Sequence, residues 1–446
     1  MEAARFGKIG FIMAAAGSAV GLGNIWKFPY MAGQNGGGAF VLIYLLTVVF
    51  IGLSIFIAEV LMGRMSRGDS VSAFEELAPK HGNLWKYAGF MVITGILILS
   101  FYTIVIGWIF KYIFLSFSSL PTTVESAGSL FGGMVGVEWF QQFIFFNMAF
   151  FLTMWIVVRG VKRGIEKVNV ILMPLLVIIL LALFFYSMSL DGFKDALYFL
   201  FYPDWSKLTG TSILKAVGHA FFTLSLGMGT IMTYAASLPK NENIVKSSFM
   251  VAVIDTLIAL GAGIIIFTFI FHFNAKPSQG PGLVFISLPA LFSQLGVLGN
   301  VISISFFVAL AFAGITSAVS IVEPTALYLI NRFNMSRAKS LTLISIVTYI
   351  FGIMAIFSNV KVYSHYFTYF GKGYFDILDY LSSAILLPLG GMIIAFFVGF
   401  VMPKSRVHAV LSKYMSETVF NLWYFSVKYI ATSAVAIVMI NKLFFS

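Results

Sequence analysis

The sequence of 446 residues contains no cysteine, which excludes disulfide scaffolds and thiolate metal sites. It has only five histidines, and no two of them have the close spacing of zinc ligands on one helix. Charged residues make up 10% of the chain, whereas soluble domains carry about 25%. Hydrophobic residues make up 60%, compared with about 45–50% in soluble domains. These features exclude an ordinary soluble enzyme and indicate a protein whose solvent is the lipid bilayer.

Long apolar runs recur along the whole chain. About 20 helical residues cross a hydrocarbon core of about 30 Å, and charged or polar loops divide the runs into eleven candidate spans. These candidates are 9–33, 38–62, 88–116, 138–158, 166–188, 211–237, 248–272, 299–330, 339–357, 374–401 and 418–444. The sequence therefore predicts an all-α polytopic membrane protein that forms a single transmembrane domain over residues 1–446.

Positive charge predicts the orientation of these spans. Most Lys and Arg residues fall in cytoplasmic segments if the N-terminus is cytoplasmic, and the basic loop 159–167 is the strongest indication. An odd number of spans then places the C-terminus on the extracytoplasmic side of the cell membrane. The net charge of +11 does not indicate nucleic-acid binding, because the basic residues stand singly between apolar runs. A secretory signal ending at Ala16 is the alternative reading of the start, but the apolar character continues to Phe40.

The first and sixth spans each contain a cluster of helix-breaking residues at membrane depth. The first reads GSAVGLGN from Gly17, and the sixth reads TLSLGMGT from Thr223. Glycine destabilises a helix interior by about 1 kcal/mol relative to alanine, so both helices are predicted to break. Glycines that only permit close helix packing are the alternative. Matching positions in two halves of the chain favour an inverted-repeat transporter, in which unwound carbonyls suit a cation and helix N-termini suit a carboxylate.

Three motifs resemble the neurotransmitter:sodium symporter family. They are GSAVGLGNIWKFPY from Gly17, NGGGAF from Asn35 and FFTLSLGMG from Phe221. The resemblance continues in order through the first ten spans. It implies a 5+5 inverted-repeat fold with broken helices 1 and 6, repeat units at about 9–188 and 211–401, and an extra helix at 418–444. It also implies sodium-coupled symport of an amino acid by alternating access, as in bacterial members with eleven spans.

The resemblance implies two sodium sites and no organic cofactor. Both sets of ligands are oxygen atoms, which hard cations prefer. Sodium site 1 would combine the substrate carboxylate with Ala19, Asn24, Thr223 and Asp255. Sodium site 2 would combine backbone carbonyls of Gly17, Val20 and Ala313 with the hydroxyls of Thr316 and Ser317. The alternative for these two hydroxyls is a bond to a carbonyl of their own helix.

Asp255 departs from the family pattern, in which many members have Asn at this position. An acidic side chain within a membrane span is a functional-site candidate by default. Chloride-independent bacterial members supply a fixed carboxylate near here, and Ala259 one turn later cannot do so. The resemblance therefore implies that this protein needs no chloride. A purely structural pairing of Asp255 with a neighbouring helix is the alternative.

The resemblance also implies a largely apolar substrate pocket. Its residues would be Ala19, Gly21, Leu22, Gly23, Ile98, Tyr102, Phe222, Ser225, Met228, Ser317 and Ile321. Tyr102 would donate its hydroxyl to the substrate carboxylate. Gly21 replaces the Asp of monoamine carriers and so favours an amino acid. The apolar lining favours hydrophobic or aromatic L-amino acids of the Trp, Tyr, Phe and Leu class.

Gate residues follow from the same resemblance. Lys27 and Asp379 would form an extracellular charge pair above Phe222, and Glu59 would hold the unwound segments. His219 lies near this gate, where it either modulates closure or only packs against its neighbours.

The cytoplasmic gate departs from the family pattern. The segment 1–6 lacks a clear Arg and Trp pair, and Asn331 replaces the partner Asp. This departure leaves open an alternative function, a sodium-dependent amino-acid sensor that binds without efficient transport. A channel would need a continuous polar pore, and an enzyme would need a nucleophile and base that the sequence does not show. We expect a monomer or weak dimer, because the family's twelfth helix is absent.

Overall fold

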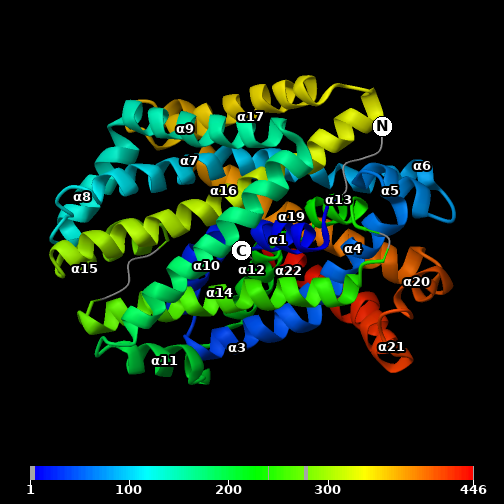
Figure 1. The fold of residues 1–446 in the computed structure, drawn as a ribbon, viewed down its shortest axis with the longest axis horizontal. Helices are drawn as coiled ribbons and strands as arrows, with labels where there is room; N and C mark the ends of the chain where they lie inside the picture. The colour runs from blue at the N-terminus through cyan, green and yellow to red at the C-terminus, as the bar shows by residue number, and fades with distance from the viewer. Residues whose placement is uncertain (1–5, 240, 276–279, 445–446) are drawn as a thin grey trace.

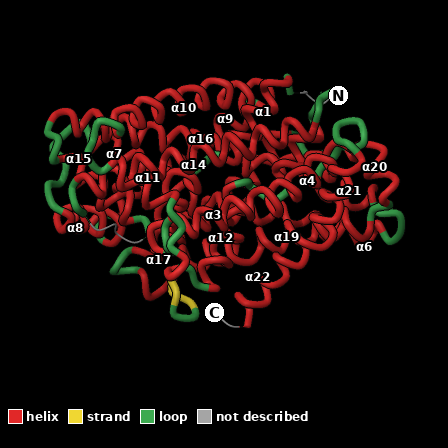
Figure 2. The backbone as a smooth tube through the Cα atoms, turned by 90° about the horizontal axis from the view of Figure 1, so that it is seen from below, coloured by secondary structure: helices red, strands yellow, loops and turns green. Residues whose placement is uncertain are grey.

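The computed structural model describes residues 6–239, 241–275 and 280–444, and most of these residues are helical. The long helices lie side by side along one direction (Figures 1 and 2). They are α3 (Gly38–Thr47), α4 (Leu53–Ser66), α7 (Ile93–Leu115), α9 (Trp139–Val158), α10 (Lys167–Ser187), α14 (Ile244–His272), α16 (Val297–Phe333), α17 (Arg337–Asn359), α19 (Leu387–Phe396) and α22 (Thr432–Phe444).

Short helices gather at the two ends of this bundle (Figure 1). One end carries α5 (Ser70–Leu77), α6 (Gly82–Trp85), α20 (Lys404–Leu411) and α21 (Glu417–Phe425). The opposite end carries α8 (Val124–Gly136), α11 (Phe193–Phe201) and α15 (Leu288–Ser293). A small hairpin of β1 (Thr368–Tyr369) and β2 (Lys372–Gly373) precedes α18 (Tyr374–Asp379).

The predicted spans are found as helices in the expected order. Within the described residues, nine helices are long and apolar enough to cross a membrane. A tenth span is a pair bent by 44°, Ile9–Ala19 with Gly23–Gln34. The predicted span 211–237 is divided into α12 (Gly210–Thr223) and α13 (Thr230–Ala236), which are each too short to cross alone. The prediction that the first and sixth spans break is therefore confirmed.

The first broken helix lies in the middle of the bundle. Its first half, α1 (Lys8–Ala19), packs against α10, α14 and α16, and the chain continues through a π-helical turn into α2 (Phe28–Gln34). Glycine allows this close packing, because a Cβ at Gly17 would lie 1.8 Å from Oδ1 of Asn169. The break is therefore surrounded by protein rather than lipid.

The second break, between α12 and α13, has a left-handed backbone. Ser225, Gly227 and Gly229 have φ angles of 54°, 80° and 78°. The backbone N–H of Gly227 donates to Oε1 of the buried Glu59 at 2.7 Å. This is the place where Glu59 was predicted to act, and its carboxylate satisfies a donor that the break removes from the helix.

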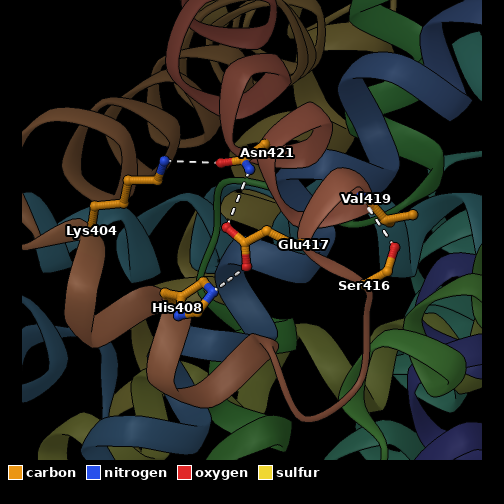
Figure 3. A network of polar contacts seen from close by, with 6 residues as sticks. All are labelled: Lys404, His408, Ser416, Glu417, Val419 and Asn421. Carbon is orange, nitrogen blue, oxygen red and sulfur yellow. Dashed lines mark hydrogen bonds and ion pairs between the residues drawn. The ribbon is translucent and has the colours of Figure 1, made fainter.

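A polar network joins α20 to α21 at one end of the bundle (Figure 3). Oε2 of Glu417 lies 2.7 Å from Nε2 of His408, and Asn421 donates to Oε1 of Glu417 at 3.2 Å. Lys404 donates to Asn421 at 2.9 Å, and Ser416 caps α21. The network fixes the turn before the last span and lies outside the broken helices.

We predict that Gly390→Ala destabilises the second break. A Cβ at Gly390 would lie 2.0 Å from the carbonyl oxygen of Gly227, so the backbone of one helix must shift. Overpacking of this kind costs about 1–3 kcal/mol. Thermal unfolding of the purified protein in detergent should show a lower melting temperature. Gly133→Ala in α8 is the matched control, because no described atom lies within 4 Å of that position; an equal effect of both substitutions would contradict the prediction.

Candidate functional site

The C-terminal end of α1 presents carbonyl oxygens that its own helix leaves unpaired. The N–H of Gly21 donates to Oδ1 of Asn24 at 2.9 Å, and the N–H of Leu22 donates to the hydroxyl of Tyr102 at 3.1 Å. In a continuous helix these two N–H groups would bond to the carbonyls of Gly17 and Ser18. Side chains have thus replaced the helical acceptors, and the two carbonyls are released into the interior.

The released carbonyls converge on Ser317 of α16. Its hydroxyl lies 3.2 Å from the carbonyl oxygen of Gly17 and 3.3 Å from those of Ser18 and Val20. One hydroxyl has one hydrogen to donate, so it cannot satisfy three acceptors. The Ser18 carbonyl also accepts from the Ser225 hydroxyl at 2.7 Å, which leaves the carbonyls of Gly17 and Val20 to share the Ser317 hydrogen. Converging oxygens of this kind fit a small hard cation. Three of the residues predicted for sodium site 2, namely Gly17, Val20 and Ser317, meet at this point.

Thr316 and Ala313 are the other two residues predicted for sodium site 2, and both lie on α16 close to Ser317 in sequence. The Thr316 hydroxyl lies 2.9 Å from the carbonyl oxygen of Phe312 and 3.0 Å from that of Ala313, both on its own helix. The alternative of bonding back to the helix therefore describes Thr316 in this structure. It does not describe Ser317, which reaches across to α1.

Asp255 of α14 is fully buried and accepts hydrogen bonds from two residues predicted for sodium site 1. Asn24 donates to its Oδ1 at 2.7 Å, and the Thr223 hydroxyl donates to the same oxygen at 3.0 Å. Among the described residues, no cationic side chain pairs with this carboxylate. A buried charge needs compensation, and sodium would supply it. Ala19 ends α1 beside this group and lines the same cavity as Thr223.

A narrow cavity lies between the two broken helices. It is lined by Ser18, Ala19, Gly21, Gly23, Ile98, Tyr102, Phe222, Thr223, Ser225, Met228, Ser317, Ile321 and Leu387. All the residues predicted for the substrate pocket are present except Leu22, which lines the next hollow outward. Sequence reasoning did not find Ser18 and Leu387. The cavity volume is about 20 Å³, so binding of an amino acid requires lining side chains to move outward.

Two polar groups shape one wall of this cavity. The Tyr102 hydroxyl accepts from Leu22, so its own hydrogen can be donated to a ligand. A Cβ at Gly21 would lie 2.5 Å from Oγ of Ser317 and 2.8 Å from Oη of Tyr102. Any larger residue at position 21 would therefore displace these hydroxyls.

Phe222 separates the cavity from an outer hollow of about 270 Å³, and its ring lines both. Nζ of Lys27 lies 4.4 Å from the centroid of this ring and 3.9 Å from Oδ1 of Asp379. The structure thus brings the predicted charge pair of Lys27 and Asp379 together beside Phe222. Beside this pair, Nε1 of Trp26 donates a hydrogen bond of 3.1 Å to the carbonyl oxygen of Gly280.

His219 is 2% exposed and packs between aromatic rings. Its ring centroid is 5.4 Å from that of Tyr44 and 6.1 Å from that of Phe28. Neither of its ring nitrogens has a hydrogen-bond partner among the described residues. The side chain also borders a hollow of about 220 Å³ shared with Lys27, so packing describes its contacts, and a role in closure stays a prediction.

A sequence model of the Sodium:neurotransmitter symporter family matches residues 4–127 and 136–445. The chain belongs to this family. It is 36% identical to the uncharacterized sodium-dependent transporter YhdH of Bacillus subtilis, over 97% of this chain and 96% of that protein. An uncharacterized sodium-dependent transporter of Haemophilus influenzae is 32% identical, over 98% of this chain and 97% of that protein. The crystal structure of MhsT in complex with L-phenylalanine has a TM-score of 0.89, with 41% identity over 98% of this chain and 99% of that one.

Membership in the symporter family fixes the class of protein. Its members are sodium-dependent membrane transporters and not enzymes, and the MhsT structure has the same fold as this chain. The expected all-α fold with two broken helices is therefore confirmed for this symporter.

The end of the bundle predicted to hold the cytoplasmic gate uses contacts that the altered gate motif did not indicate. Asn331 donates to Oδ2 of Asp69 at 3.1 Å. The N–H of Phe6 donates to the carbonyl of Ser237 at 3.3 Å, and its ring packs at 5.2 Å against that of Tyr234. The preceding residues, which include Arg5, lie outside the described part of the chain. Phe6 thus provides an aromatic contact at this end of the bundle.

Glu323, to which the sequence assigned no role, forms a buried ion pair. The Arg337 guanidinium donates to Oε1 of Glu323 at 3.0 Å and to the carbonyl of Val157 at 2.8 Å. These bonds join the C-terminal part of α16 to the beginning of α17 and the end of α9. Glu323 therefore has a structural role in this symporter.

We predict that Ser317→Ala weakens sodium binding about tenfold, since the loss of a polar contact to an ion costs about 1.5–3 kcal/mol. The measurement is the sodium concentration that gives half of the maximal thermal stabilisation in detergent. Ser320→Ala is the matched control, because that hydroxyl donates at 2.7 Å to the carbonyl of Ser317 on its own helix. Equal sodium responses of the two variants would show that Ser317 is not a ligand.

Proposed function

We propose that this symporter imports hydrophobic or aromatic L-amino acids together with sodium, by alternating access and without chloride. The proposal rests on one observation. Carbonyls released by the break in α1, the buried carboxylate of Asp255 and an apolar cavity lie next to one another in the interior. Carbonyls and Asp255 suit sodium, and the cavity suits the side chain of an amino acid. The Tyr102 hydroxyl lies between the two regions and is suited to the substrate carboxylate.

The lining of the cavity supports a hydrophobic substrate. Ile98, Phe222, Met228, Ile321 and Leu387 present apolar side chains. The unbranched thioether of Met228 adapts to several shapes, which supports a range of side chains rather than one. MhsT binds L-phenylalanine, and its structure is similar to that of this chain over nearly the whole length.

Sodium and substrate share ligands in this proposal. A substrate carboxylate at Tyr102 would adjoin Ala19 and Thr223 and supply a further oxygen to sodium site 1. Each ligand would then raise the affinity of the other by the same factor, because coupling free energy is reciprocal. This coupling would allow the sodium gradient to drive accumulation of the amino acid.

Asp255 is the reason to propose chloride independence. Its carboxylate is 0% exposed and provides a fixed negative charge next to Asn24 and Thr223. A fixed charge removes the need for a mobile anion to compensate sodium at this place. Ala259, one turn later on α14, has no group that could contribute.

We further propose that the N-terminus and the basic turn 159–167 are cytoplasmic, following the positive-inside pattern. Units 9–188 and 211–401 would then be the inverted repeats, with one broken helix at the start of each. The end of the bundle that carries α5, α6, α20 and α21 would face the cytoplasm.

The first test is uptake into proteoliposomes with chloride replaced by gluconate. We expect an inward sodium gradient to drive accumulation of labelled tryptophan, tyrosine, phenylalanine or leucine, and potassium in place of sodium to abolish it. Addition of chloride should leave the rate unchanged. Sodium-dependent binding without accumulation would instead identify a sensor, and neither binding nor uptake of the four amino acids would reject the proposed substrate class.

The second test is Asp255→Asn, which keeps the shape of the side chain and removes its charge. We expect sodium-driven uptake in gluconate to fall at least about tenfold, because sodium site 1 loses its charged ligand. Asp195→Asn is the matched control, since Asp195 is exposed at the start of α11. Unchanged uptake by Asp255→Asn would show that the carboxylate does not compensate sodium.

A further inference from the structure

The turn between α9 and α10 concentrates positive charge on one exposed surface. Arg159, Lys162, Arg163 and Lys167 fall within nine residues, and all four side chains are exposed. Among the described residues, none of them forms an ion pair with a carboxylate. The one acidic residue of the turn, Glu166, accepts the N–H of Gly7 at its Oε1 at 3.1 Å, and its Oε2 is buried without a hydrogen-bond partner among the described residues.

The four basic side chains surround a common hollow, which we call the basic hollow. Its volume is about 770 Å³, and its lining residues are Arg159, Lys162, Arg163, Glu166, Lys167, Val170 and Ile171. The hollow therefore has a basic rim and an apolar side. Basic residues that serve only to orient the spans in the membrane would not need to line one concave surface together.

The apolar side of the basic hollow continues along α10. Val170 and Ile171 are 40% and 49% exposed, and Leu175 and Ile178 follow at 42% and 61%. Residues three or four apart lie on one face of a helix, so these side chains form a stripe that leads away from the charges. A ligand that fits both parts has an anionic head and apolar chains.

Trp155 marks the membrane interface beside the hollow. Its indole is 53% exposed, and the Arg159 guanidinium lies 3.4 Å from the ring centroid. Exposed tryptophan is enriched where membrane meets water. The basic rim therefore lies at the depth of lipid headgroups.

We propose that the basic hollow binds the headgroup of an anionic phospholipid, with the acyl chains along the exposed stripe of α10. Lys and Arg in such hollows between helices attract phosphate groups of lipids. The apolar continuation favours a phospholipid over a soluble phosphate. This inference does not depend on the proposed substrate or on sodium coupling.

Glu166 connects the basic hollow to the first broken helix. The residue lines the hollow and holds the N–H of Gly7, directly before α1. A Cβ at Gly10 would lie 1.9 Å from Oε1 of Glu166, so α1 packs closely on this side chain. Lipid at the hollow therefore adjoins the contact that positions the beginning of α1, and it should raise the melting temperature of the protein.

The test measures lipid binding to the purified full-length protein by native mass spectrometry. The probes are dioleoyl phosphatidylglycerol, dioleoyl phosphatidylcholine and glycerol 1-phosphate. In the site variant, Gln replaces each of four residues, Arg159, Lys162, Arg163 and Lys167. The control variant makes the same charge change at four other exposed positions, Lys80, Lys339, Arg406 and Lys413.

We expect wild type and control to bind phosphatidylglycerol at least about tenfold more tightly than phosphatidylcholine, and the site variant to lose this preference. A preference retained by the site variant would overturn the proposal. Equally tight binding of glycerol 1-phosphate would also overturn it, by identifying a soluble anion as the ligand. A cooperative thermal unfolding transition, compared with that of the wild type, checks that both variants fold. The double variant Lys162→Gln with Arg163→Gln replaces the site variant if the site variant does not fold.

A second readout locates the lipid. Brominated phosphatidylglycerol should quench tryptophan fluorescence more in the wild type than in Trp155→Phe, and brominated phosphatidylcholine should show a smaller difference. The same difference for both lipids would place the preferred lipid away from the basic hollow and overturn the proposal.

Discussion

The need to satisfy free backbone groups inside a membrane governs this structure. Hydrocarbon offers no hydrogen bonds, so every N–H and carbonyl that leaves a helix at membrane depth must find protein, ligand or enclosed water. The N–H groups at the first break meet Asn24 and Tyr102, and that of Gly227 meets Glu59. The carbonyls are not satisfied to the same extent, since those of Gly17 and Val20 share one hydroxyl. This surplus of acceptors is the feature on which the proposed cation site depends.

The same constraint explains why the ion and substrate regions adjoin. A helix that breaks exposes acceptors at the end of one half and donors at the start of the next. Asp255 adds a full negative charge beside the acceptors, and the apolar cavity begins at Thr223, which donates to that carboxylate. In the proposed mode of binding, a sodium ion would compensate the charge of Asp255, and the carboxylate of the amino acid would supply a further oxygen to the same ion. Such a shared contact would couple the binding of the two ligands.

Sequence reasoning found the parts of this arrangement that depend on backbone chemistry. The glycine clusters predicted both breaks, and the helices end at Ala19 and Thr223 as those clusters indicate. It did not find Leu387, because α19 is apolar on all sides and its sequence marks no face. The resemblance assigned Leu22 to the pocket, and in the structure this residue lines the adjoining outer hollow. The face that α19 turns toward the cavity depends on tertiary packing, which a single sequence does not encode in a readable pattern.

The two ends of the bundle use different kinds of contact to hold their elements together. At one end Lys27 and Asp379 lie 3.9 Å apart with partly exposed side chains, and such pairs contribute about 0–1 kcal/mol. At the other end Arg64 donates at 3.0 Å to the carbonyl of Pro239, and Arg67 donates to the carbonyl of Ala236. These two bonds connect the C-terminal end of α4 with the end of α13 and the segment after it. The ion pair can therefore separate without freeing a backbone group, whereas separation at the other end would leave two carbonyls in need of new donors.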